Sequence, residues 1–178
     1  FMINIEKYIS DLIVLLKQQF GPRLLYVGLQ GSYLRGEATA NSDIDVMIVL
    51  DSLSVTDLAQ YRAIIHSLPT PEKSCGFICA KADLANWNPL EICHLLHSTK
   101  DYYGVLKDLV PVSCQEDVRN FIKFGLNNLY HELCHRYIHT PKENSIKKLP
   151  FTYKSVFFIL QNLHYLKSGS FIATKKEL

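Results

Sequence analysis

Two apolar runs that flank a turn-rich segment decide the fold: LYVGLQGS at residues 25–32 and DIDVMIVL at residues 43–50. Short runs of this kind, bounded by Gly, Asn and Ser, predict β-strands. In a strand, the side chains of residues i and i+2 project from the same face. We therefore expect Asp43 and Asp45 to lie together on one face, with Ile44 and Val46 on the other.

The residues around these strands indicate a metal and phosphate site. Two neighbouring carboxylates, Asp43 and Asp45, repel each other unless a positive charge lies between them. Hard divalent cations, Mg²⁺ above all, bind through one or two carboxylates together with phosphate oxygens. Gly31 and Ser32 follow the first strand, where free backbone N–H groups and a hydroxyl can receive a phosphate. Gly-Ser alone is more typical of an ordinary tight turn, so the inference depends on the combination.

The amino-acid composition limits which kinds of protein the chain can be. With 178 residues, 48% hydrophobic and 20% charged, the chain should form a soluble fold with one domain or two small ones. A net charge of +2 gives no general case for nucleic acid or for an anionic membrane. The sequence has no apolar run of membrane-spanning length and no signal peptide. Five cysteines at irregular spacing indicate reduced thiols, so we expect a cytoplasmic protein.

Hydrophobic periodicity and turn residues predict an α+β fold with a small mixed β-sheet. We expect a first domain at residues 1–111 and a C-terminal helical bundle at residues 112–178. An N-capped turn at 174–178 suggests a truncated chain or a missing last helix. The predicted elements are a helix over 3–19, a strand over 23–30, a turn and loop over 31–42, a strand over 44–50, a helix over 56–68, a strand over 74–80, short helices within 83–110, a helix over 115–139, a loop over 140–150 and a helix over 151–167.

Two helices of the second part carry distinct hydrophobic patterns. The helix over 115–139 has one apolar stripe, whose residues face one way. The helix over 151–167 is apolar nearly all round, which predicts burial between other elements. The stripe comprises Ile122, Leu126, Leu129, Leu133 and Tyr137.

The order strand, Gly31-Ser32, about ten residues, then Asp43-Ile44-Asp45 on the next strand resembles the nucleotidyltransferase superfamily typified by DNA polymerase β. Within it, the chain looks most like the aminoglycoside adenylyltransferases of the streptomycin and spectinomycin type. That narrower resemblance rests on Trp87-Asn88-Pro89 and on Ser168-Gly169 followed by Thr174-Lys175.

The resemblance implies a reaction and a role for each matched residue. Asp43 and Asp45 would hold one or two Mg²⁺ ions, and Gly31 and Ser32 would bind the β- and γ-phosphates of ATP. Lys175 would reach the nucleotide phosphates, although a solvated lysine at a helix start is an equal alternative. The implied reaction is transfer of AMP to a hydroxyl of a small molecule, with aminoglycoside-like acceptors and a homodimer left open.

One departure from the family pattern concerns the third strand. The family carries a third carboxylate there, whereas residues 74–80 read SCGFICA, and the acidic position falls near Cys75. A thiol does not replace a carboxylate for Mg²⁺. Either Glu72 or another acid substitutes, or the protein is a catalytically weak nucleotide-binding or antitoxin-type module.

A rival motif lies on the long helix. His131-Glu132-Leu133-Cys134-His135 fits His-Glu-x-x-His, the pattern of zinc proteases, with both histidines on one helix face. No clear third ligand follows, and His139 does not match the extended motif. A zinc hydrolase is therefore the second alternative, against the simpler interpretation of a polar helix face.

Overall fold

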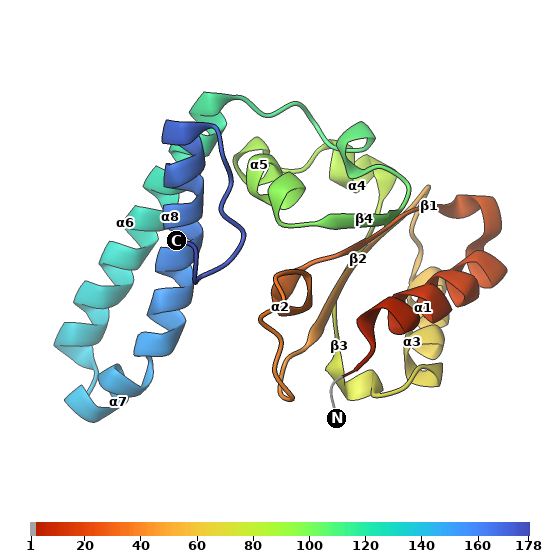
Figure 1. Ribbon diagram of the computed structural model, residues 1–178, viewed down its shortest axis with the longest axis horizontal. Helices are drawn as coiled ribbons and strands as arrows, with labels where there is room; N and C mark the ends of the chain where they lie inside the picture. The colour runs from red at the N-terminus through yellow and green to blue at the C-terminus, as the bar shows by residue number, and fades with distance from the viewer. Residues whose placement is uncertain (1–2) are drawn as a thin grey trace. The chain divides into compact units, whose positions relative to one another are not determined.

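The computed structural model describes residues 3–178 (Figure 1), with a four-stranded sheet followed by a helical region. The predicted α+β class with a mixed sheet is confirmed. Contacts divide the described chain into two compact units: a sheet unit, which runs to Trp87 and includes Leu95–Pro111, and a helical unit, which contains Asn88–His94 and Val112–Leu178. The assignment of residues 1–111 and 112–178 to separate domains stays a prediction. Among the described residues, no helix combines the length and apolar character that a membrane span requires.

The sheet has the strand order β3-β2-β1-β4. β1 pairs antiparallel with β2 on one side and with β4 on the other, whereas β2 and β3 are parallel. The first three strands match their predicted positions, but β4 lies in a segment for which we predicted only short helices. The strands are β1 (Leu24–Leu29), β2 (Ile44–Leu50), β3 (Ser74–Ala80) and β4 (Lys100–Tyr103).

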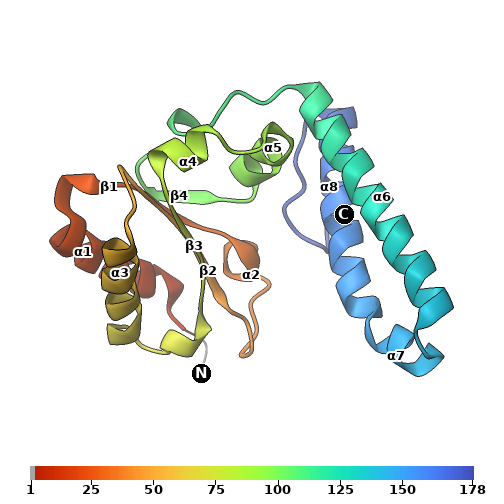
Figure 2. The same ribbon diagram turned by 180° about the vertical axis from the view of Figure 1, so that it is seen from behind.

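Both faces of the sheet are covered. Helices α1 and α3 pack on the face that carries Val27 and Ile48 (Figure 2). The other face carries Met47 and Val49, which pack with Leu84 of α4. The helices and short helical turns of the sheet unit are α1 (Ile5–Phe20), a 3₁₀ turn at Gly21–Arg23, α2 (Gly31–Leu34), α3 (Val55–Ser67), 3₁₀ turns at Pro71–Lys73 and Leu106–Asp108, α4 (Lys81–Ala85) and the end of α5 (Pro89–His97).

An ion pair ties the start of β1 to α3. The Arg23 guanidinium donates to both carboxylate oxygens of Asp57, at 2.8 and 3.0 Å, and to Asp51. Asp57 also forms a capping box with Ser54, the N-cap of α3. The hydrogen bonds from Arg23 and Ser54 lower the pKa of Asp57 well below its usual range. The charge of Asp57 therefore stabilises this corner of the fold.

The helical unit is built on two helices that lie side by side, α6 (Gln115–His139) and α8 (Leu149–Ser168), joined by the short helix α7 (Lys142–Lys147) (Figure 1). The two helices pack closely at Gly125, where an added Cβ would lie 3.0 Å from Cγ1 of Ile159. The predicted loop over 140–150 was wrong in part, because it contains α7.

One prediction about these helices was also wrong. Helix α8 is not buried all round, since Phe151 and Tyr153 are exposed. On α6, Ile122 of the apolar stripe is buried, whereas Leu126, Leu133 and Tyr137 are exposed. The physical reason is that each helix of a two-helix layer needs to bury only the side that faces its neighbour.

Candidate functional site

The turn after β1 brings Gly31 against Asp45. The N–H of Gln30 donates to the carbonyl oxygen of Asp45 at 2.8 Å, which joins the end of β1 to β2. Gly31 follows with φ +71°, and a Cβ built on it would lie 1.9 Å from Oδ2 of Asp45. Only glycine fits this position, because any side chain would displace the carboxylate and would be strained at that φ. The Asp45 carboxylate thus lies directly against the backbone that begins α2.

Ser32 and Asp43 are two further predicted site residues near this contact. Ser32 lies in the first turn of α2, and its carbonyl oxygen accepts from the N–H of Glu37 at 2.9 Å. Asp43 is exposed and Asp45 is half-buried, and the residue between them, Ile44, is fully buried on the opposite face. Asp43 directly precedes β2 and Asp45 is its second residue, so both residues lie at the end of β2 that meets Gly31.

The donor set at this edge fits a hard divalent cation. Two carboxylates supply oxygen ligands, and Mg²⁺ completes its coordination with phosphate oxygens and water. The backbone N–H groups at the start of α2, beside the Asp45 carboxylate, would donate to a phosphate bound there. In residues 3–178, no group of three or more His, Cys, Asp or Glu side chains is arranged to hold a metal ion by itself. Any metal at Asp43 and Asp45 would therefore depend on ligands from the nucleotide.

Strand β3 places Cys75 beside Asp45. In the parallel register of β2 and β3, Asp45 is paired with Cys75, so both side chains project from the same face. Cys75 is exposed, and Glu72 lies outside the strand in the 3₁₀ turn Pro71–Lys73. At Gly76, an added Cβ would lie 2.1 Å from the carbonyl oxygen of Val46, which fixes the close approach of the two strands. The strand position next to Asp45 therefore carries a thiol.

Comparison with known proteins assigns the chain to a family. The model of the nucleotidyltransferase domain matches residues 9–72, a range that includes Gly31, Ser32, Asp43 and Asp45. A protein of Methanocaldococcus jannaschii named "Putative protein adenylyltransferase" is 33% identical over 78 residues, which is 40% of this chain and 78% of that protein. The chain belongs to the nucleotidyltransferase domain family.

A solved structure shares the fold of this nucleotidyltransferase. The spectinomycin adenyltransferase AAD(9) from Enterococcus faecialis, crystallised with ATP and spectinomycin, matches with a TM-score of 0.50 and 19% identity. The match covers 94% of this chain and 78% of that one. A toxin-antitoxin crystal structure with AMP-PNP matches with a TM-score of 0.40 and 20% identity, over 72% of this chain and 92% of that chain.

Lys175, the remaining predicted site residue, belongs to the helical unit. After Gly169 the chain folds back along α8 (Figure 1), where the side-chain amide of Gln161 donates to the carbonyl oxygens of Ile172 and Ala173. The Lys175 ammonium lies 5.9 Å from the centre of the Phe157 ring. Its contact with a nucleotide phosphate stays a prediction.

The His-Glu-x-x-His motif of this nucleotidyltransferase lies on an exposed part of α6. The rings of His131 and His135 have their centroids 6.0 Å apart, and those of His135 and His139 are 4.7 Å apart. Glu132 accepts a hydrogen bond from Arg136, in an ion pair that turns its carboxylate toward α8. A zinc hydrolase would need this carboxylate near the metal-bound water, so the arrangement does not support the zinc alternative.

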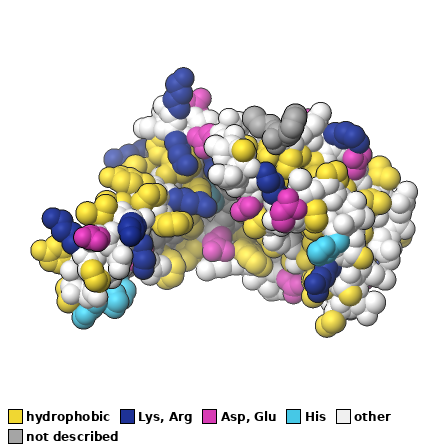
Figure 3. Space-filling model, turned by 90° about the horizontal axis from the view of Figure 1, so that it is seen from below, with side chains coloured by type: hydrophobic (Ala, Val, Ile, Leu, Met, Phe, Trp, Pro, Cys, Tyr) yellow, Lys and Arg dark blue, Asp and Glu magenta, His cyan; other side chains and the backbone are white. Residues whose placement is uncertain are grey.

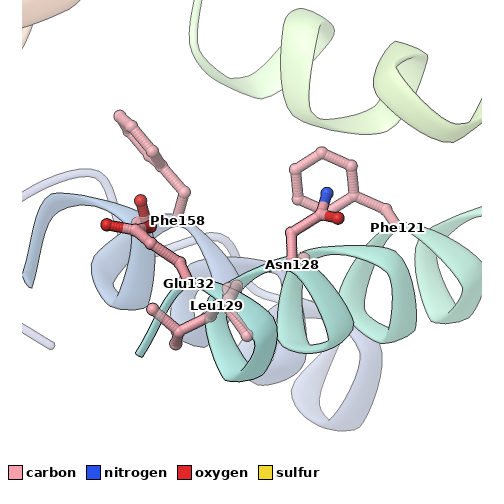
Figure 4. A pocket seen from close by; sticks show the side chains of 8 residues that line it. Phe121, Asn128, Leu129, Glu132 and Phe158 are labelled. Carbon is pink, nitrogen blue, oxygen red and sulfur yellow. The ribbon is translucent and has the colours of Figure 1, made fainter. Parts of the chain in front are cut away.

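A cavity of about 230 Å³ between α6 and α8 is a feature that the sequence did not predict (Figure 4). Behind it, buried Arg136 donates to Glu132 and to the hydroxyl of Thr152, and its Nη1 has no partner in the described part of the chain. The imidazole of His94 stacks on Phe121, with ring centroids 5.7 Å apart. No motif marks the cavity, because residues of two separate helices form it. Its lining is Phe121, Gly125, Asn128, Leu129, Glu132, Ser155, Phe158 and Ile159.

Proposed function

We propose that this nucleotidyltransferase transfers AMP from ATP, as the magnesium complex, to a hydroxyl group of a small molecule, with aminoglycoside-like compounds among the acceptors. The observation that carries the proposal is the contact between the Gly31 backbone and the Asp45 carboxylate, with Asp43 directly before β2. This contact supports a phosphate cradle and a metal-binding carboxylate side by side. The five cysteines of the chain, all free, support a reaction in the cytoplasm.

Each residue has a defined part in the proposed reaction. The backbone of Gly31 and the hydroxyl of Ser32 would bind the β- and γ-phosphates, and Asp43 and Asp45 would hold Mg²⁺. The bound ion would neutralise the charge that develops at the α-phosphate. The oxygen of the acceptor hydroxyl forms a bond to the α-phosphorus and loses its proton to water, the bond from this phosphorus to the β-phosphate oxygen breaks, and pyrophosphate leaves. The chain would act mainly by positioning the phosphates.

Two comparisons support different acceptors. The shared fold with a spectinomycin adenyltransferase, over 94% of this chain, supports ATP as donor and a small-molecule acceptor. The archaeal relative named as a protein adenylyltransferase supports a second candidate, a hydroxyl on a protein. A third candidate, a catalytically weak nucleotide-binding module, is favoured by the thiol of Cys75 beside Asp45.

Turnover distinguishes these candidates. Pyrophosphate release would be measured with ATP and Mg²⁺ over a panel of aminoglycosides, aminocyclitols and hydroxyl-bearing proteins. The proposal predicts release that requires a small-molecule acceptor and that falls at least ~1,000-fold in Asp45→Asn. The matched control is Asp108→Asn, at an exposed carboxylate of the Leu106–Asp108 turn, which should keep full activity. Release that depends on a protein acceptor would favour the second candidate, and ATP binding without release would favour the third.

A further inference from the structure

The side chain of Gln30 connects the start of the candidate site to the segment that follows α5. Gln30 lies between β1 and α2, and its amide nitrogen Nε2 donates to the hydroxyl oxygen of Thr99 at 2.8 Å. The antiparallel register of β1 and β4 pairs Leu29 with Lys100, so the adjoining residues Gln30 and Thr99 lie opposite each other. The hydrogen bond therefore joins the point where β1 ends to the point where β4 begins.

Thr99 is a fixed partner for this amide. Its hydroxyl donates its single proton to the carbonyl oxygen of Leu95, in the last turn of α5, at 2.7 Å, so the hydroxyl can only accept from Gln30. Its methyl carbon Cγ2 packs against β1, where it lies 2.7 Å from a Cβ built on Gly28. A helix end and a strand thus hold the hydroxyl in place, and the side chain of Gln30 is anchored through it.

The backbone of Gln30 makes a second connection, to the carboxylate side of the site. Its N–H donates to the carbonyl oxygen of Asp45 at 2.8 Å, and the next residue, Gly31, contacts the Asp45 carboxylate. Gln30 is also the N-cap of α2, but its side chain makes no capping hydrogen bond. The side chains usual at an N-cap are short and bond the first turn of the helix, whereas that of Gln30 bonds Thr99. One residue therefore holds Asp45 through its backbone and the start of β4 through its side chain.

The charge of the chain makes the placement of these groups important. The net charge is only +2, and Figure 3 shows acidic and basic side chains scattered together over the face in view. A triphosphate would therefore gain little from a general positive field, and its affinity would depend on a few groups in defined places. Partners that orient metal ligands typically change metal affinity or activity by about 10- to 100-fold when they are removed.

We propose that Gln30 is a positioning residue, which fixes Gly31 and Asp45 for Mg²⁺ and nucleotide through its hydrogen bond to Thr99. The inference rests on the proposed function, because it assigns Gln30 a part in that same site. Gln30 and Thr99 act through the backbone at the end of β1 and need no contact with the nucleotide. Loss of their hydrogen bond frees this backbone to move, and the Asp45 carboxylate moves with it.

The test compares nucleotide binding in variants that keep the shape of each side chain but remove the hydrogen bond. Gln30→Met and Thr99→Val should each raise the dissociation constant of a non-hydrolysable ATP analogue about 10-fold, measured by calorimetry with Mg²⁺ at about 25 °C. Each should also raise the Mg²⁺ concentration needed for half-maximal binding, because the Asp45 carboxylate is displaced. The double variant should bind no more weakly than the weaker single variant. Thr99→Ser, which keeps the hydroxyl, should restore the affinity of the wild type.

Asn86→Ala is the matched control. The Asn86 amide also donates to an oxygen of the sheet unit, the carbonyl of Ala82 at 2.8 Å, but outside the site. This variant should bind the analogue like the wild type. Thermal unfolding of the free proteins separates positioning from stability. A purely structural hydrogen bond would lower Tm and leave both the dissociation constant and the Mg²⁺ requirement unchanged, and that result would overturn the inference.

Asp45→Asn separates this inference from the proposed function. If Asp45→Asn weakens binding while Gln30→Met and Thr99→Val do not, the positioning role is wrong and the nucleotide site stands. If Asp45→Asn binds like the wild type, the site itself is wrong, and the role of Gln30 falls with it. Losses in Gln30→Met and Thr99→Val that multiply in the double variant would also overturn the inference, since the two side chains would then act independently.

Discussion

The two units of the molecule bury their hydrophobic residues to different extents. In the sheet unit, neighbouring residues of β2 such as Met47 and Ile48 point to opposite faces, and both are fully buried. In the helical unit, α6 is 25 residues long, yet its buried hydrophobic residues are Val118 and Ile122, in its first half. A sheet between two layers of helices has no free face, whereas a helix with one neighbour keeps most of its surface in water. The predicted catalytic carboxylates therefore lie on the unit with the larger buried core, whereas the helical unit keeps hydrophobic side chains on its surface.

The largest expected effect concerns the close contact in the sheet unit. Gly31→Ala would place a Cβ on the Asp45 carboxylate at a positive φ. We expect kcat for pyrophosphate release to fall ~100-fold or more, because a shift of about 1 Å at a reacting centre has this effect.

Gly36→Ala is the matched control for that contact. Gly36 has φ +68°, close to the value of Gly31, but nothing lies within 4 Å of its added Cβ. It should therefore reproduce the backbone strain without the collision. An equal loss of kcat in both variants would contradict the assignment of the contact to catalysis.

A second prediction compares the stability of the two units. Ile48→Ala should lower the free energy of unfolding by about 3 kcal/mol, because it leaves a cavity in a fully buried layer. Leu133→Ala, at a side chain that is 40% exposed on α6, should cost less than about 1 kcal/mol when measured on the monomer at low concentration. Urea unfolding of both variants measures the two values. Similar losses would show that the helical unit is packed as tightly as the sheet.

The third prediction concerns the thiol beside Asp45. Cys75→Asp would add a carboxylate on the face that carries Asp45 and should raise the affinity for Mg²⁺ and the rate of transfer about 10-fold. Cys75→Ser keeps the size without a charge and should leave both unchanged. Titration with Mg²⁺ in the presence of ATP measures the affinity. A decrease in Cys75→Asp would indicate that a third carboxylate is already supplied from elsewhere.

The smallest effect is the pH dependence of the Arg23–Asp57 pair. The pKa of Asp57 is lowered in the folded state, so its contribution to stability is fully present above its unfolded value of about 3.9. That contribution is lost as the pH falls through the folded-state pKa. Asp57→Asn should lower Tm at about pH 7 and should reduce the further loss of Tm on acidification. Thermal scans from about pH 7 to about pH 3 would detect this, and parallel curves for the two proteins would contradict it.

The sequence predicted the sheet unit better than the helical unit for physical reasons. The apolar runs at 44–50 and 74–80 are bounded by turn residues, and β2 and β3 have those limits. Strand β4, with the sequence KDYY, has no hydrophobic alternation and depends on its pairing with β1. Periodicity identified the apolar residues of α6 but could not show which of them its neighbour α8 would cover.

The candidate site, too, could be predicted from the sequence only in part. The resemblance to nucleotidyltransferases predicted that Gly31-Ser32 and Asp43-Ile44-Asp45 belong to one site, and the antiparallel pairing of β1 with β2 brings Gly31 against Asp45. The register of β2 and β3, which puts Cys75 next to Asp45, depends on a parallel pairing across α3 and could be inferred only from a family resemblance. The cavity behind Phe121 and Phe158 depends on helix packing and has no signature in either helix alone.

Calorimetric titration with a non-hydrolysable ATP analogue, with and without Mg²⁺, tests most directly whether Asp43 and Asp45 hold the metal of the bound nucleotide. We expect binding that requires Mg²⁺ in the wild type and that is weakened at least ~10-fold in both Asp43→Asn and Asp45→Asn, with Asp108→Asn unchanged. Binding with the same affinity in the absence of Mg²⁺ and in both aspartate variants would contradict the placement of the metal and nucleotide at Gly31, Ser32, Asp43 and Asp45.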